Sequence, residues 1–198
     1  EDLLPALAQQ QAYACAVTDA GNLFALVKFY KEALKTGVKP IVGADIWLRE
    51  EGSEPLSRIT LLCMNRQGYK NLCDLISDSY LVGQVAGKPT IKRHQLEKYG
   101  RDLIVLSGGR WGDVGKSLLA GKLEEAEQRL SFWQTHFADR YYIELCRTGR
   151  EDEERCNVAS VQLALTHGVP VVAVNDVQFM EEVDFDAHEV RVCIHDGY

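Results

Sequence analysis

The sequence predicts an α/β fold in which helices cover a parallel sheet that is either open or closed into a barrel. Short apolar, β-branched runs alternate with segments of helical periodicity along the whole chain. Glycine and proline mark the turns between these segments. No polar linker divides the 198 residues, so we expect a single domain spanning residues 1–198.

The first half of the chain predicts two helices and a hairpin before a long helix. In order, we expect helical pattern in EDLLPALAQQ (1–10), a strand at 13–18, a helix at 23–36, a strand at 39–49, a polar turn at 50–55, a strand at 59–64 and a helix at 67–81. The second helix is expected to bury one face, formed by Leu23, Leu26, Val27, Tyr30 and Leu34.

The second half repeats the alternation. After a GQVAGKP loop (83–89) we expect a helix at 92–99, a strand at 102–107, helices at 112–121 and 123–137, a strand at 140–145, a helix at 152–167, a strand at 169–175 and a helix at 185–194. These patterns give six strands in all.

Charge and composition exclude some functions. Lys and Arg total 22 against 29 Asp and Glu, and the net charge of -7 opposes binding of a phosphate backbone. No apolar run approaches the roughly 20 residues that cross a bilayer. The cysteines form no C-x-x-C pair and are expected to be reduced core residues of a cytoplasmic protein: Cys15, Cys63, Cys73, Cys146, Cys156 and Cys193.

Three aspartates stand at predicted strand ends, where α/β proteins gather functional groups. Asp19, Asp45 and Asp176 could converge and hold a hard cation such as Mg²⁺ or Mn²⁺. Alternatively, Asp19 and Asp176 cap the helices that follow them. No histidine forms an H-x-H or H-x-x-x-H pair, and only His188 is expected near the Asp176 rim.

The segment GGRWGDVGKS (108–117) imitates a phosphate-binding loop. Counting back from Gly115 across four residues reaches Arg110 where the motif needs glycine, so the register fails by one. We expect a tight turn at Gly108 and Gly109 instead, with Lys116 in solvent.

Several ordered blocks resemble the PHP (polymerase and histidinol phosphatase) domain of the alpha subunit of bacterial DNA polymerase III. They are TDAGNLFALVKFYKEALKTGVKPIVGAD, LLCMNRQGYKNLCDLIS, LIVLSGG, DRYYIEL, GVPVVAVNDVQF and DFDAHEVRVCIHDGY. The resemblance covers essentially the whole chain. It implies a distorted TIM-like (β/α)7 barrel whose rim holds up to three metal ions for phosphodiester hydrolysis, with the first strand lying outside this chain.

At the matched positions, this sequence departs from the family's ligand pattern. The histidine of T-D-H is Ala20, and the glutamate of G-x-E is Asp45. Arg58 stands where a histidine opens a later strand. Gly109 replaces the cysteine of S-G-C, and Gln178 replaces the last histidine of N-D-x-H.

Only Asp19 and Asp176 match the ligand positions unchanged. Losing imidazole and thiolate ligands removes much of the metal-binding free energy, and an arginine adds a permanent cation. We therefore expect no bound metal, no catalytic residue and no cofactor in this domain, with Mg²⁺ chemistry confined to the polymerase part of the parent chain. Arg58 is expected to pair with one or more of the remaining aspartates.

The resemblance then implies a non-catalytic scaffold within a polymerase that binds DNA elsewhere in its chain. Its partners would be other polymerase III subunits, above all the proofreading exonuclease subunit, with no membrane involved. The alternative is an active metal-dependent phosphoesterase or 3'-5' exonuclease domain, which would need ligands from the first strand together with Asp19, Asp45 and Asp176.

Overall fold

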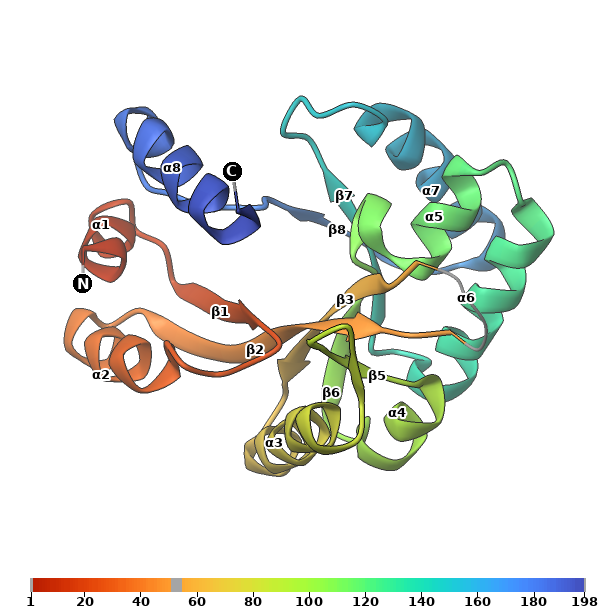
Figure 1. Cartoon of the computed structure of the whole chain (residues 1–198), viewed down its shortest axis with the longest axis horizontal. Helices are drawn as coiled ribbons and strands as arrows, with labels where there is room; N and C mark the ends of the chain where they lie inside the picture. The colour runs from red at the N-terminus through yellow and green to blue at the C-terminus, as the bar shows by residue number, and fades with distance from the viewer. Residues whose placement is uncertain (1, 51–54, 198) are drawn as a thin grey trace.

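A computed structural model describes residues 2–50 and 55–197 (Figure 1). The first half of the chain contains α1 (Leu3–Gln9), β1 (Ala14–Ala20), α2 (Leu26–Thr36), β2 (Lys39–Leu48), β3 (Ser57–Cys63), α3 (Arg66–Leu81), β4 (Gln84–Val85) and β5 (Lys88–Ile91). The expected strands and helices of this half are confirmed. The tip of the predicted turn, residues 51–54, lies outside the described residues.

The second half contains three more strands among helices. Its elements are α4 (Arg93–Tyr99), β6 (Leu103–Leu106), η1 (Gly109–Trp111), α5 (Asp113–Leu119), α6 (Leu123–Phe137), β7 (Tyr141–Cys146), α7 (Glu153–His167), β8 (Val171–Val174), η2 (Glu182–Asp184) and α8 (Phe185–Asp196). None of the described helices is both long and apolar enough to cross a bilayer.

The sheet is mixed, whereas the sequence predicted a parallel one. Its main path runs β4-β5-β2-β3-β6-β7-β8, and β1 pairs with β2 off this path. β3 is antiparallel to both β2 and β6: Leu48 at the end of β2 pairs with Ser57 at the start of β3, so β3 runs back along β2. The predicted hairpin is therefore confirmed, and its consequence for the next strand pair was missed.

The described strands do not close into a barrel. Among the described residues, β1 pairs only with β2 and β8 pairs only with β7. Figure 1 shows β1, α1 and α2 on one side of the molecule and β7, α5, α6 and α7 on the other. Ion pairs of Arg58, at the start of β3, with Asp45 of β2 and with Asp176 after β8 nevertheless bring these three parts of the sheet together at one rim.

One large core unites the centre of the sheet with the helices around it. Ile46, Leu61, Leu72, Val105 and Trp133 are each at most 2% exposed in this cluster. A buried carboxylate, Asp113 at the start of α5, is part of this packing. It accepts hydrogen bonds from Arg93 Nη2 at 2.6 Å and from Trp133 Nε1 at 3.0 Å. These bonds tie α4, α5 and α6 together.

Two local predictions were wrong. Helix α2 buries Leu26, Phe29 and Ala33, whereas Val27 and Leu34 are exposed. The apolar residues of α2 fit two overlapping helical faces, and contact with the sheet selects the one that carries the small Ala33. The predicted GQVAGKP loop also contains two short paired strands, β4 and β5.

The cysteines are free, as expected, although they are not all core residues. Cys156 is buried, Cys193 is exposed, and the other four are partly buried. Burial raises the pKa of the Cys63 thiol to about 12, with a further contribution from Cys73. A thiol with this pKa is a poor nucleophile near neutral pH.

Candidate functional site at the strand rim

Arg58 lies between two carboxylates that come from distant parts of the chain. Its Nη1 atom is 3.7 Å from Asp45 Oδ2 and 3.9 Å from Asp176 Oδ1. Between 17% and 25% of each of the three side chains is exposed, so the group is largely shielded from water. The predicted pairing of Arg58 with the remaining aspartates is confirmed.

The pairing of β2 with β3 brings Arg58 and Asp45 together. Asp45 faces Thr60 across the two strands, and Thr60 Oγ1 donates a hydrogen bond of 2.6 Å to Asp45 Oδ1. Arg58 is two residues from Thr60 and so points to the same face of the sheet. Burial raises the pKa of Asp45, while the Thr60 hydrogen bond and the Arg58 charge oppose this shift.

Asp176 follows β8 and has two further partners. Arg150 Nη1 lies 3.2 Å from Asp176 Oδ2, and Gln178 Nε2 donates to Oδ1 at 2.9 Å. No helix begins directly after Asp176, because the next helical turn is η2 at Glu182–Asp184. The interpretation of Asp176 as a helix cap was therefore wrong.

Asp19, in contrast, does not join this cluster. Its Oδ2 atom accepts a hydrogen bond of 2.8 Å from the backbone N–H of Ala25, immediately before α2. This bond satisfies the amide of Ala25, the N-cap residue of α2, but α2 has no side-chain cap hydrogen bond, so Asp19 anchors the start of the helix without being its capping residue. Ala20 pairs with Asp45 in the parallel β1–β2 register, and its methyl group has no charge or hydrogen bond to offer.

Glu144 on β7 is a site residue that the sequence interpretation missed. Its side chain is 8% exposed, and its carboxylate accepts a hydrogen bond from the backbone N–H of Gly108. Burial raises the pKa of Glu144 to about 7, although the hydrogen bond from Gly108 acts in the opposite direction and lowers it. Asp45 and Asp176 raise this pKa further and Arg58 lowers it, so Glu144 belongs to the same electrostatic cluster.

The turn after β6 places Gly108 against β3. Gly108 has φ 76°, and a Cβ atom there would lie 1.9 Å from the carbonyl oxygen of Arg58. Gly109 opens η1 with φ 52° and carries no side chain toward the rim. The predicted tight turn is confirmed, but Lys116 was wrongly expected in solvent, because its Nζ donates to the Leu56 carbonyl.

His188 and Gln178 complete the predicted set. His188 packs against the Phe179 ring, with centroids 5.5 Å apart, and its Nδ1 lies 3.0 Å from Arg191 Nη2. It therefore contacts the segment between β8 and η2, and Arg191 of its own helix, α8. Gln178 stands where the family pattern has a histidine, and its side-chain amide donates a hydrogen bond to Asp176.

The donor groups at this cluster do not fit a metal ion of the kind expected from the family pattern. A guanidinium already lies between Asp45 and Asp176, and a dication there would meet a like charge. Within residues 2–50 and 55–197, no group of three or more His, Cys, Asp or Glu side chains is arranged to hold a metal.

Comparison with known proteins identifies the family. A family model described as the PHP domain matches residues 1–148. DNA polymerase III subunit alpha of Vibrio cholerae is 50% identical over 186 residues, which cover 93% of this chain and 16% of that protein. The corresponding protein of Escherichia coli K12 is 50% identical over 187 residues, covering 93% and 16%. The chain thus spans only a small part of these relatives.

Solved structures support the fold alone. A protein from Bifidobacterium adolescentis described as a metal-dependent phosphoesterase has a TM-score of 0.52 at 11% identity, covering 87% of this chain and 79% of that one. An amidohydrolase from Chromobacterium violaceum has a TM-score of 0.57 at 11% identity, covering 95% and 89%. The family model that matches residues 1–148 shows that the chain belongs to the PHP domain family.

Proposed function

We propose that this chain is the PHP domain of a cytoplasmic DNA polymerase III alpha subunit, that it performs no hydrolysis, and that it serves as a scaffold and docking platform for the proofreading exonuclease subunit. The observation that carries the proposal is the position of Arg58. Its side chain lies between Asp45 and Asp176 and already supplies a positive charge to both carboxylates.

Hydrolysis of a phosphodiester by an enzyme of this kind needs a metal-activated water and groups that stabilise negative charge. In the described part of the chain, the rim provides a partly buried guanidinium already balanced by carboxylates, and no imidazole that contacts them. Glu144 is buried and its carboxylate is held by Gly108. These residues have the composition of a structural ion-pair network, which links β2, β3 and the segment after β8.

The net charge of -7 favours a role in protein binding, because it opposes direct binding to the negatively charged backbone of nucleic acid. The DNA polymerase III alpha subunits that resemble this chain are about six times longer, so in our proposal polymerisation and DNA binding belong to other parts of the protein. The PHP domain would then connect the polymerase with a separate proofreading enzyme.

Two measurements on the full-length protein that carries this chain test the proposal. Incubation with a model phosphodiester in the presence of Mn²⁺ or Zn²⁺ should give no hydrolysis above the rate of heat-denatured protein. Mixing at micromolar concentration with the exonuclease subunit of the same bacterium should give one peak on a sizing column. Metal-dependent turnover would favour the phosphoesterase alternative, and two separate peaks would refute the docking role.

A further inference from the structure

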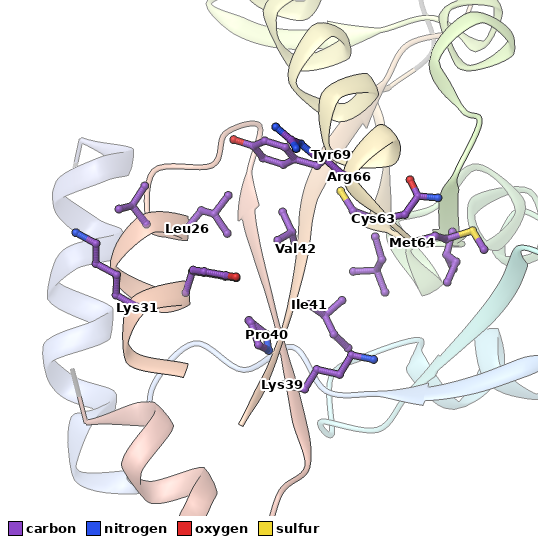
Figure 2. A pocket seen from close by; sticks show the side chains of 15 residues that line it. Leu26, Lys31, Lys39, Pro40, Ile41, Val42, Cys63, Met64, Arg66 and Tyr69 are labelled. Carbon is purple, nitrogen blue, oxygen red and sulfur yellow. The ribbon is translucent and has the colours of Figure 1, made fainter. Parts of the chain in front are cut away.

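A groove of about 900 Å³ lies between α2 and α3 and follows the first half of β2 (Figure 2). Figure 2 shows Leu26 and Lys31 of α2 on one side, Arg66 and Tyr69 of α3 on the other, and β2 between them. Among the described residues, the lining contains no aspartate, glutamate or histidine. The groove therefore has the composition of a binding surface rather than of a hydrolytic site.

The pairing of the strands leaves this part of the sheet open. β3 pairs with β2 from Gly43 to Leu48, so among the described residues Lys39–Val42 have β1 as their only partner strand. The first half of β2 thus forms the floor of the groove, and α2 and the start of α3 form its walls.

The groove concentrates positive charge on an acidic chain. Two segments, residues 26–42 and 62–69, provide all of the described lining except Ile104. They contain five basic residues and one acid, Glu32, so their formal charge is +4, and the rest of the chain carries -11 to give the total of -7. Glu32 is itself paired with Lys35 at 2.7 Å. The charge is therefore distributed unevenly, and these two segments form a basic face.

Three cations line this groove and are exposed to solvent. They are Lys31, Lys39 and Arg66. In residues 2–50 and 55–197, the ion pairs involve none of the three. Physiological salt screens exposed charges that are more than about 8 Å apart, so the acidic remainder of the molecule does not cancel their attraction for an anion in the groove.

Two exposed tyrosines lie beside these cations. Tyr30 on α2 is 47% exposed, and Tyr69 on α3 is 39% exposed. Val27 and Met64, which are 62% and 51% exposed, extend the apolar surface. Sites for single-stranded nucleic acid combine cations that bind phosphates with aromatic rings on which unpaired bases stack. A duplex keeps its bases within its own stack, so it would leave these rings without a partner.

We propose that this groove is an auxiliary binding site for single-stranded DNA, with phosphates against Lys31, Lys39 and Arg66 and bases against Tyr30 and Tyr69. DNA is the strand to test because the relatives of this chain are DNA polymerase subunits. The site is additional to the DNA binding that we assign to other parts of the protein, and the docking function does not depend on it. An acidic peptide could pair with the same cations, but exposed rings beside cations favour flat bases.

Photocrosslinking of the full-length protein that carries this chain tests the site, because it reports where the strand lies even when DNA also binds elsewhere. The probe is oligo(dT) in which iodouracil replaces some thymines, and peptide mass spectrometry locates the crosslinks. We expect crosslinks at Tyr30 or Tyr69. Raising the salt from about 50 to about 200 mM should raise the DNA concentration for half-maximal crosslinking there about twentyfold, as counterion release predicts for three phosphate contacts.

A charge-reversal variant tests the role of the cations. Lys31→Glu with Arg66→Glu should reduce crosslinking at the two tyrosines about tenfold or more, because it replaces two of the three phosphate contacts with repulsion. The matched control is Arg147→Glu with Arg155→Glu, at side chains 78% and 70% exposed on the side of the molecule that carries β7 and α7 (Figure 1). It changes the net charge equally and should leave crosslinking within about twofold of wild type.

Three results would overturn the proposal. The first is the absence of crosslinks at the groove, which would leave an acidic protein segment as the occupant that its charge fits. The second is crosslinking that survives the charge reversal in a variant with the melting temperature of wild type. The third is equal competition by unlabelled duplex and single-stranded DNA of the same length, because bases in a duplex cannot stack on the tyrosines. The sizing-column test of docking is independent of all three.

Discussion

Arg58 carries the positive charge around which the rim is arranged. Two largely shielded carboxylates lie within 4 Å of its Nη1 atom, and Arg150 provides a second, more exposed cation for Asp176. Its buried Nε atom has no hydrogen-bond partner among the described residues. The guanidinium is therefore held by charge rather than by ideal bidentate geometry.

Replacing Arg58 with alanine should destabilise the domain, because Asp45 and Asp176 would keep their burial and lose a cation. We expect a loss of about 1 to 3 kcal/mol, below the cost of breaking a fully buried pair because each side chain is partly exposed. Thermal melting of both proteins at pH 7 measures it. Arg150→Ala, at a side chain 44% exposed, should lower the melting temperature less.

Glu144 makes stability depend on pH in a direction that can be predicted. Its folded pKa of about 7 lies above the ordinary value of 4.5. Such a carboxyl contributes stability that is fully present below the unfolded pKa and is lost as the pH rises through the folded value. The domain should therefore lose stability between about pH 4.5 and pH 7 through this group.

Glu144→Gln should remove this pH dependence while keeping an oxygen that can accept the Gly108 bond. Relative to wild type, the variant should gain up to about 3 kcal/mol of unfolding free energy between pH 4.5 and pH 8. Urea unfolding across this range measures the difference, with the exposed Glu97→Gln as control. Parallel curves for wild type and Glu144→Gln would show that Glu144 is not held in a raised-pKa state.

At the scale of elements, the turn from β6 into α5 depends on close backbone contact. Cβ atoms at Gly108, Gly112 and Gly115 would approach the carbonyl oxygens of Arg58, Ser107 and Gly109 to 1.9, 1.7 and 2.1 Å. These glycines therefore serve packing of the turn against β3 and against itself. The close contacts explain why this segment is rich in glycine like a phosphate-binding loop, although its glycines do not have the spacing of one.

Gly108→Ala should destabilise the domain far more than Gly121→Ala. The two residues have nearly equal φ values, 76° and 72°, so both substitutions strain the backbone by a similar amount of about 1 kcal/mol. Only Gly108 would also clash, and we expect several additional kcal/mol of destabilisation by urea unfolding. Equal losses at the two sites would mean that the turn can move away from β3 at little cost.

At the scale of the whole molecule, strands and helices could be predicted because their signals are local. Apolar runs and turn residues identified the other six strands, while β4 and β5, of two and four residues, lie in a segment whose glycines and proline favour a loop. The antiparallel β3–β6 pair and the gap between β1 and β8 depend on how distant segments meet. No local periodicity contains that information.

The site residues also divide into those with a local sequence signal and those without one. Arg58 and Asp176 could be grouped because they lie next to the start and the end of predicted strands, and Asp45 because it matches the glutamate of the family's G-x-E. Glu144 was missed, since a single glutamate inside an apolar strand has no spacing that distinguishes a rim residue from a solvent-facing one. Only its burial and its bond from Gly108 show that it belongs to the cluster.

The most direct test of this view of the rim is elemental analysis of the full-length protein, purified without chelators and dialysed against metal-free buffer. Zinc, manganese and iron should each be present at well below one ion per chain, because a guanidinium and two carboxylates leave a dication no adequate set of donors. Two or three tightly held ions per chain that disappear on Asp45→Asn and Asp176→Asn substitution would contradict it.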